Sequence, residues 1–255
     1  MSEARKHARQ LVSAWVATRS EEECFPVNCT EIAKGFGIVV HEGEDLGEEF
    51  QGALFLQDGL KAIIYNDKIQ EDGRKNFTVA HELGHFFLHK DRKELKCSMD
   101  DLETFDDKPP HGKEIEREAN EFAANLLMPA KDIGPYLKTN ELDLNLVETL
   151  SDRYGTSMTS TAFRIVEVTG KPSAILMLDE EGVVLWCKRN KAFQGFFVRK
   201  GFQVSFPLRG CQSSYECTQK AWMPSAQYEK WLCHQSVLHM SNYGKYLVLL
   251  RGEFL

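Results

Sequence analysis

Hydrophobic positions in the first ninety residues follow helical spacing in some segments and extended spacing in others. Residues 4–17 place apolar side chains every three or four positions, which predicts an amphipathic helix. A second, short helix is expected to begin at Asn28 or Thr30 and to end at Gly35 or Gly37. The pattern then predicts a strand over 37–41, strands over 51–56 and 60–65 joined by a hairpin turn at Gln57-Asp58-Gly59, and a helix over 74–89.

The pattern changes twice in the rest of the chain. Residues 91–112 are acidic and show no regular spacing, which predicts an exposed loop of unusual length. A long helix is expected from Lys113 to Met128, and two short helices within 142–169 have the outline of a helix-turn-helix. Beyond Gly170 the apolar runs predict strands over 174–178, 183–187, 195–206 and 245–252, with one helix over 225–233.

These patterns together predict an α+β protein with more than one domain. We expect one domain over 1–140, a helix-turn-helix-like helical extension over 141–169, and a C-terminal β-containing domain over 170–255. The boundary near 170 rests on the Gly170-Lys171-Pro172 stretch and on the change of pattern after it. A chain of 255 residues is long enough to build two hydrophobic cores.

Composition and charge narrow the class of protein. Hydrophobic residues make up 42% and charged residues 27% of the chain, which excludes wholesale disorder. The formal net charge of -7 argues against a general basic nucleic-acid binder. The sequence has no apolar run of about 18 residues and no pattern of a secretory signal. We therefore expect no membrane partner, a cytoplasmic location and free thiols at the seven cysteines.

The residues most suggestive of chemistry form an H-E-x-x-H motif over 81–85. Positions i and i+4 of a helix lie on one face, so His81 and His85 can both reach one zinc ion at roughly 2.0–2.1 Å. Glu82 lies beside the first histidine and can accept a proton from a water activated by the metal. The motif therefore predicts a catalytic zinc site rather than two unrelated surface histidines.

A catalytic zinc site of this kind needs a third protein ligand and an open position. Spacing alone does not choose among the four carboxylates of the following helix, which are Glu114, Glu116, Glu118 and Glu121. Asn120 favours Glu116, because Asn120 lies one turn further along the same face. From there its side chain can form a hydrogen bond with the far nitrogen of a ligand histidine.

The two motifs, taken together, resemble the ImmA/IrrE family of zinc metallo-endopeptidases. The resemblance rests on Phe77–His85 and Glu116–Pro129 in this order, and it covers roughly residues 1–130 with a weaker extension to 169. It implies a zincin-like metallopeptidase domain in which His81, His85 and Glu116 bind zinc and Glu82 is the general base. It also implies a narrow protein substrate, typically a helix-turn-helix repressor or an antitoxin-like regulator that is cleaved under stress.

Supporting roles can be assigned only as candidates. Such an enzyme is expected to have an oxyanion donor, and Tyr65, His89 and His111 are candidates by their place in the sequence, although each also has an ordinary structural explanation. The hairpin over 51–65 is expected to offer an exposed edge that aligns a peptide by β-addition. We expect residues 170–255 to control or target the protease. If they supply a catalytic group instead, its candidates are His234, His239 and Tyr243.

Two patterns in the C-terminal part have both a chemical and a structural interpretation. Three cysteines and a histidine can be imagined as a second zinc site, but they lack the short spacing of zinc ligands, which favours plain thiols; they are Cys211, Cys217, Cys233 and His239. Aromatic and basic residues alternate over 191–206 and can stack on single-stranded nucleic acid. Strand residues that fill a small core are the simpler interpretation of those aromatics.

Two rival functions remain open at this level. The first is a regulatory protein that binds a repressor through a zinc-peptidase-like fold without cutting it. The second is a DNA-binding regulator that uses residues 142–169, but the second helix there carries only Arg164 as a basic residue. We therefore expect that segment to be a packing module or a substrate dock, without direct binding of nucleic acid.

Overall fold

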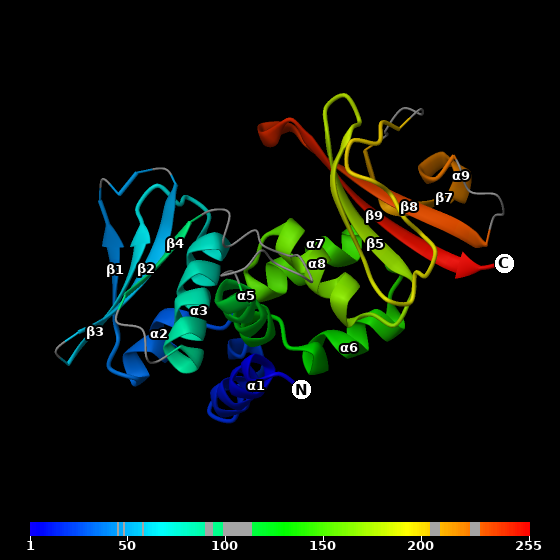
Figure 1. The fold of residues 1–255 in the computed structure, drawn as a ribbon. Coiled ribbons are helices and arrows are strands. Elements are labelled where there is room, and N and C mark those ends of the chain that lie inside the picture. Colours follow the sequence, from blue (N-terminus) through cyan, green and yellow to red (C-terminus); the bar gives the residue numbers. More distant parts are fainter. Residues whose placement is uncertain are drawn as a thin grey trace. The chain divides into compact units, whose positions relative to one another are not determined.

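The computed structural model describes residues 1–44, 46–47, 49–57, 59–89, 94–98, 114–204, 210–224 and 230–255, the segment 94–98 by its backbone. Figure 1 shows the chain as a ribbon. The helices are α1 (Glu3–Val16), α2 (Cys29–Gly35), α3 (Asp72–Leu88), α5 (Glu114–Leu127), α6 (Ala130–Thr139), α7 (Leu144–Tyr154), α8 (Met158–Val168) and α9 (Gln219–Trp222), with 3-10 turns η1 (Glu21–Glu23) and η2 (Ser241–Tyr243). The strands are β1 (Val39–Gly43), β2 (Phe50–Gln57), β3 (Leu60–Asn66), β4 (Glu94–Ser98), β5 (Ser173–Asp179), β6 (Val184–Arg189), β7 (Cys211–Thr218), β8 (Trp231–Met240) and β9 (Lys245–Phe254).

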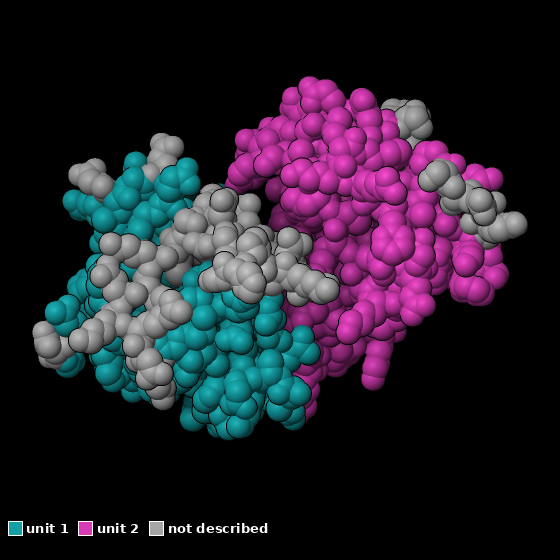
Figure 2. Space-filling view, viewed as in Figure 1, with its two compact units in different colours: residues 1–129, 152–157 teal, residues 130–151, 158–255 magenta. Residues whose placement is uncertain are grey.

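The chain forms two compact units, coloured separately in Figure 2. Unit 1 comprises Met1–Pro129 and Asp152–Ser157, and unit 2 comprises Ala130–Ser151 and Met158–Leu255. Helices and sheets occur in both, and the C-terminal part is rich in strands, which confirms the α+β class. The functional division into 1–140, 141–169 and 170–255 stays a prediction. No helix among the described residues is long and apolar enough to span a membrane.

Unit 1 contains a four-stranded sheet with the order β1-β3-β2-β4. The predicted hairpin is confirmed, because β2 and β3 pair antiparallel from Gly52–Tyr65 to Gln57–Leu60. The prediction that this hairpin has an exposed edge was wrong, because β1 pairs with β3 in parallel and β4 pairs with β2 antiparallel. β4 also corrects the prediction of a continuous loop over 91–112, since residues 94–98 form a strand by pairing with β2. The other residues of that loop lie outside the described part of the chain.

The segment Asp152–Ser157 belongs to unit 1 although its flanking helices belong to unit 2. Tyr154 is fully buried and meets the ring of Phe25 edge-on at 5.2 Å between centroids. Gly155 adopts a positive φ of 58° and lies against Pro26. It also contacts α3, because a Cβ on Gly73 would come within 2.6 Å of the Gly155 carbonyl oxygen. The turn between α7 and α8 therefore packs directly against the first turn of α3.

Unit 2 is built on an antiparallel sheet with the order β6-β5-β9-β8-β7. The interior strand β5, between β6 and β9, is buried on both faces: Ala174, Leu176 and Leu178 belong to the core of the unit, and α8 packs against the strand. Burial of both faces explains why β5 reads as a continuous apolar run. The second helix of the helix-turn-helix outline therefore packs against a sheet, and its Arg164 is buried and paired with Glu167.

Two predictions for unit 2 were wrong, and the helix α6 was missed. Residues 195–204 form turns and irregular backbone instead of a strand, with a single β-bridge at Gln203, and 205–206 lie outside the described residues. The expected helix over 225–233 is contradicted at its end, where β8 begins at Trp231, while 225–229 are not described. The helix α6 was not expected at all, because Pro135 inside it interrupts the pattern that sequence analysis follows.

Candidate metal centre

The ligand atoms of His81, His85 and Glu116 form a small triangle. The Nε2 atoms of the two histidines are 3.0 Å apart, and each lies 3.1 Å from Oε2 of Glu116. Atoms spaced in this way could all bind one zinc ion, whose bonds to histidine nitrogen are roughly 2.0–2.1 Å long. Among the described residues this is the only group of three or more potential ligands close enough to share one metal ion.

Close packing of two helices brings Glu116 to the histidines. α3 carries both histidines on successive turns, and α5 carries Glu116 near its start. The helices touch at Gly84, where an added Cβ would lie 3.0 Å from the Cα and 3.1 Å from the carbonyl oxygen of Ala119. Two small residues at this point let the backbones approach, so a single carboxylate of α5 reaches both imidazoles of α3.

Asn120 fixes the orientation of His81. Its Oδ1 lies 2.8 Å from Nδ1 of His81, one helical turn beyond Glu116. An amide oxygen can only accept, so Nδ1–H of His81 donates to it. The neutral ring then keeps its lone pair on Nε2, inside the triangle, as a metal ligand requires. This is the arrangement that the spacing of Glu116 and Asn120 led us to expect.

Electrostatics in the triangle favour a bound cation. Burial lowers the pKa of His81, but the hydrogen bond that Glu116 accepts from its ring and the charges of Glu82 and Glu116 raise the pKa overall. Burial also lowers the pKa of His85, to about 4. The pKa of Glu116 is raised by burial but driven well below its ordinary range by its contacts with His81 and His85. A buried negative carboxylate between two imidazoles therefore attracts positive charge, whether a proton or a metal ion.

Glu82 is fully buried on the side of α3 that faces β2. An added Cβ on Gly52 of that strand would come within 3.0 Å of Oε1 of Glu82 and 2.6 Å of the Thr78 side chain. The absence of a side chain at Gly52 therefore makes the space that the carboxylate occupies. Sequence analysis did not identify this glycine, because its neighbour lies thirty positions away in the chain.

The structure separates the other candidate carboxylates from the triangle. Glu121 pairs with Nε of Arg5 at 2.7 Å, and Glu118 pairs with Nε2 of His89 at 3.2 Å. Glu114 is exposed at the start of α5. These contacts favour Glu116, which the sequence alone favoured only through Asn120.

The proposed oxyanion donors stay candidates. His89 turns its Nδ1 towards Nδ1 of His85, at 3.0 Å, and so approaches the histidine from the side opposite the triangle. Tyr65 lies on β3 opposite Gly52, with Nζ of Lys75 6.0 Å from its ring centroid. His111 lies outside the described residues.

The patterns of unit 2 have structural explanations among the described residues. Phe193 and Phe196 are buried and stacked at 4.2 Å, and Phe202 packs against the same core. Phe197 is exposed beneath Arg189, and Phe206 is not described. The imagined second zinc ligands are in different environments: Cys211 is exposed, Cys217 half-buried and Cys233 buried, while His239 stacks on Tyr246.

Comparison with known proteins adds a family and a fold. The model of the IrrE N-terminal-like domain, Peptidase_M78, matches residues 33–166, slightly more than half of the chain. A solved structure of a Mycobacterium tuberculosis transcriptional regulator superposes with a TM-score of 0.61 at 15% identity. That alignment covers 99% of this chain and 77% of the regulator. No curated protein matches the sequence.

Proposed function

We propose that this chain, which belongs to the family of the IrrE N-terminal-like domain (Peptidase_M78), is a zinc-dependent endopeptidase with Glu82 as its general base. The family match gives residues 33–166 a metallopeptidase-like character. The observation that carries the proposal is the buried triangle of His81, His85 and Glu116. Two histidines and one carboxylate are a ligand set of catalytic zinc, whereas structural zinc sites have four protein ligands, usually including cysteines.

The chain's own groups divide the work of peptide hydrolysis. A zinc ion held by the triangle supplies a Lewis acid, which polarises the scissile carbonyl and lowers the pKa of a water towards about 7. Glu82 accepts a proton as the water oxygen bonds to the carbonyl carbon, and it then delivers that proton to the departing amine. The peptide C–N bond breaks, leaving a carboxylate and an amine. Gly52 keeps β2 close to Glu82 and so holds the carboxylate in place.

The proposed substrate is a specific regulatory protein. We infer a helix-turn-helix repressor or an antitoxin-like regulator from the family resemblance. Residues 170–255 are proposed to control or target the protease, because every proposed ligand and the base lie between positions 81 and 120. Burial of Arg164 supports a packing role for α8 over DNA binding.

The test is co-incubation of the full chain with regulators encoded beside its gene, followed by mass spectrometry of fragments. Glu82→Gln is expected to lower the cleavage rate by about 10²–10⁴-fold, because it removes the base and keeps the shape. It is also expected to keep one zinc per chain, since Glu82 is not a ligand in this proposal. Equal cleavage by the variant would rule out Glu82 as the base. A regulator that binds both proteins and yields no fragment would instead favour binding without cutting.

A further inference from the structure

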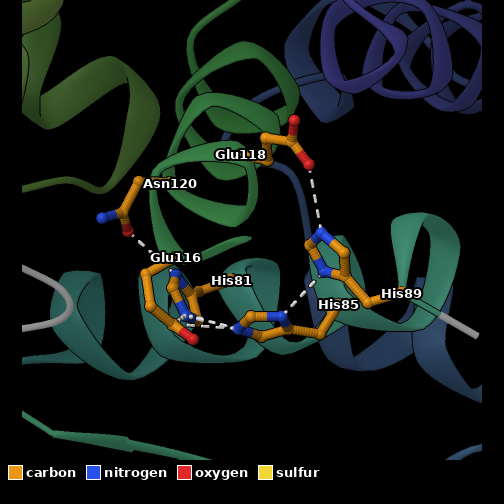
Figure 3. Close-up of polar contacts among 6 residues, drawn as sticks. All are labelled: His81, His85, His89, Glu116, Glu118 and Asn120. Carbon is orange, nitrogen blue, oxygen red and sulfur yellow. Dashed lines mark hydrogen bonds and ion pairs between the residues drawn. The ribbon is translucent and has the colours of Figure 1, made fainter. Parts of the chain in front are cut away.

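A second row of contacts lies behind the ligand triangle. Nδ1 of His85 is 3.0 Å from Nδ1 of His89, and Nε2 of His89 is 3.2 Å from Oε2 of Glu118. Figure 3 shows the row leading from the triangle through the ring of His89 to α5. The His89 side chain is only 9% exposed, whereas that of Glu118 is 45% exposed. The row therefore runs from the buried centre to a carboxylate that meets water.

The donor and the acceptor of each hydrogen bond in this row can be assigned by starting from the carboxylate of Glu118. A carboxylate only accepts, so Nε2–H of His89 donates to Glu118. A neutral imidazole with its proton on Nε2 presents a lone pair on Nδ1, so Nδ1 of His89 accepts from Nδ1–H of His85. His85 then keeps its own lone pair on Nε2, the atom that belongs to the triangle.

We propose that His89 and Glu118 are positioning residues that hold the tautomer and ring orientation of His85 for metal binding. The inference rests on the proposed metal centre and extends it. It gives His85 the counterpart of what Asn120 gives His81: each ligand histidine donates its far N–H to a fixed acceptor. Metal-binding histidines usually have such a partner, and losing it typically costs about 10–100-fold in metal affinity or activity.

Two packed helices are enough to position all the groups of this arrangement. His81, His85 and His89 follow one another at intervals of four residues: His81 and His85 occupy successive turns on one face of α3, and His89 is the residue that caps its C-terminus. α5 supplies the metal ligand Glu116 and both end points, Glu118 and Asn120. The packing of these two helices thus sets the position of every group in the two rows. A merely structural His89 would contribute only its ring, whose centroid lies 5.1 Å from that of His85.

Three substitutions in the full chain separate the two roles of His89. His89→Phe keeps a ring of similar size but removes the acceptor, so zinc affinity is expected to fall about 10–100-fold. His89→Asn loses the ring but carries an amide oxygen close to the position of Nδ1, and it is expected to restore most of the affinity. Glu118→Ala is expected to have a smaller effect in the same direction, because water can reach the half-exposed end of the row. His7→Phe is the matched control, since His7 stacks on Phe87 and contacts Glu3 without touching His85.

The readouts are zinc affinity by chelator competition, the visible spectrum of the Co²⁺-substituted protein, and the imidazole ¹H–¹⁵N spectrum of the zinc form. Wild-type protein is expected to show His85 protonated on Nδ1, and His89→Phe to shift the Co²⁺ bands. Unchanged affinity and spectra in both His89→Phe and Glu118→Ala would overturn the proposal. So would wild-type affinity in His89→Phe together with a loss in His89→Asn, which would mark the ring as a packing element. None of these measurements uses a substrate, so they remain decisive even if no proteolysis is found. Normal proteolysis together with wild-type zinc affinity in the variants would refute only the positioning role of His89 and Glu118.

Discussion

At each ligand histidine, the nitrogen facing away from the triangle decides whether the other nitrogen can bind a metal. At His81, Oδ1 of Asn120 accepts from Nδ1–H at 2.8 Å, so that the lone pair of the ring stays on Nε2. Asn120→Ala is expected to weaken zinc binding by about 10–100-fold, because the ring loses its acceptor and its fixed orientation. Asn120→Asp keeps an oxygen acceptor and is expected to retain more affinity. Chelator competition measures both variants, and wild-type affinity in Asn120→Ala would contradict the assigned role.

The choice of Glu116 over its neighbours is also testable with single residues. Glu116→Ala is expected to lower zinc affinity by more than Asn120→Ala does, because it removes a ligand from the triangle itself. The control is Glu114→Ala, two positions earlier on the exposed start of α5. Zinc at 100 times its dissociation constant is expected to stabilise the wild-type and Glu114→Ala proteins by about 2.7 kcal/mol against unfolding. A thermal melt of Glu116→Ala with the same zinc-dependent gain would move the third ligand to another acid.

Among elements, the crossing of α3 and α5 is the contact on which the site depends. Gly84→Val is expected to push the helices apart, because even a Cβ would meet the backbone of Ala119 at 3.0 Å. Overpacking of this kind typically costs about 1–3 kcal/mol of stability, and here zinc affinity is expected to fall with it. Gly134→Val in α6 is the matched control for the low helix propensity of valine, since nothing lies within 4 Å of its Cβ. Equal zinc affinity in the two variants would show that the crossing tolerates a side chain.

Elements whose signal is local could be predicted from the sequence, and elements formed by distant pairing could not. α3 and α5 were predicted because their buried faces recur with helical period. β4 was not predicted, because its residues become a strand only through pairing with β2, some forty positions earlier. β7 was not predicted either, because it is an edge strand with no fully buried residue and therefore lacks an apolar pattern. The same distinction holds in the site, where the helical spacing indicated His81, His85 and Asn120 but not the contact of Gly52 with Glu82.

At the scale of the whole chain, two compact units with separate cores predict that damage to one core can spare the site in the other. Gly252 on β9 is buried, and a Cβ there would lie 2.5 Å from Cε2 of the fully buried Phe193. Gly252→Ala is therefore expected to destabilise unit 2 by about 1–3 kcal/mol.

Gly170→Ala is the control for that substitution, because the space around its Cβ is open. Zinc stoichiometry and affinity are expected to remain those of the wild type in both variants, since all three proposed ligands belong to unit 1. Denaturant unfolding followed by tryptophan fluorescence reports mainly on unit 2, because Trp186, Trp222 and Trp231 belong to it and only Trp15 belongs to unit 1. Chelator competition reports on the proposed metal centre in unit 1. A loss of zinc affinity in Gly252→Ala that matches its loss of stability would show that the two units fold as one cooperative system, and the C-terminal residues would then act on the metal centre through stability itself.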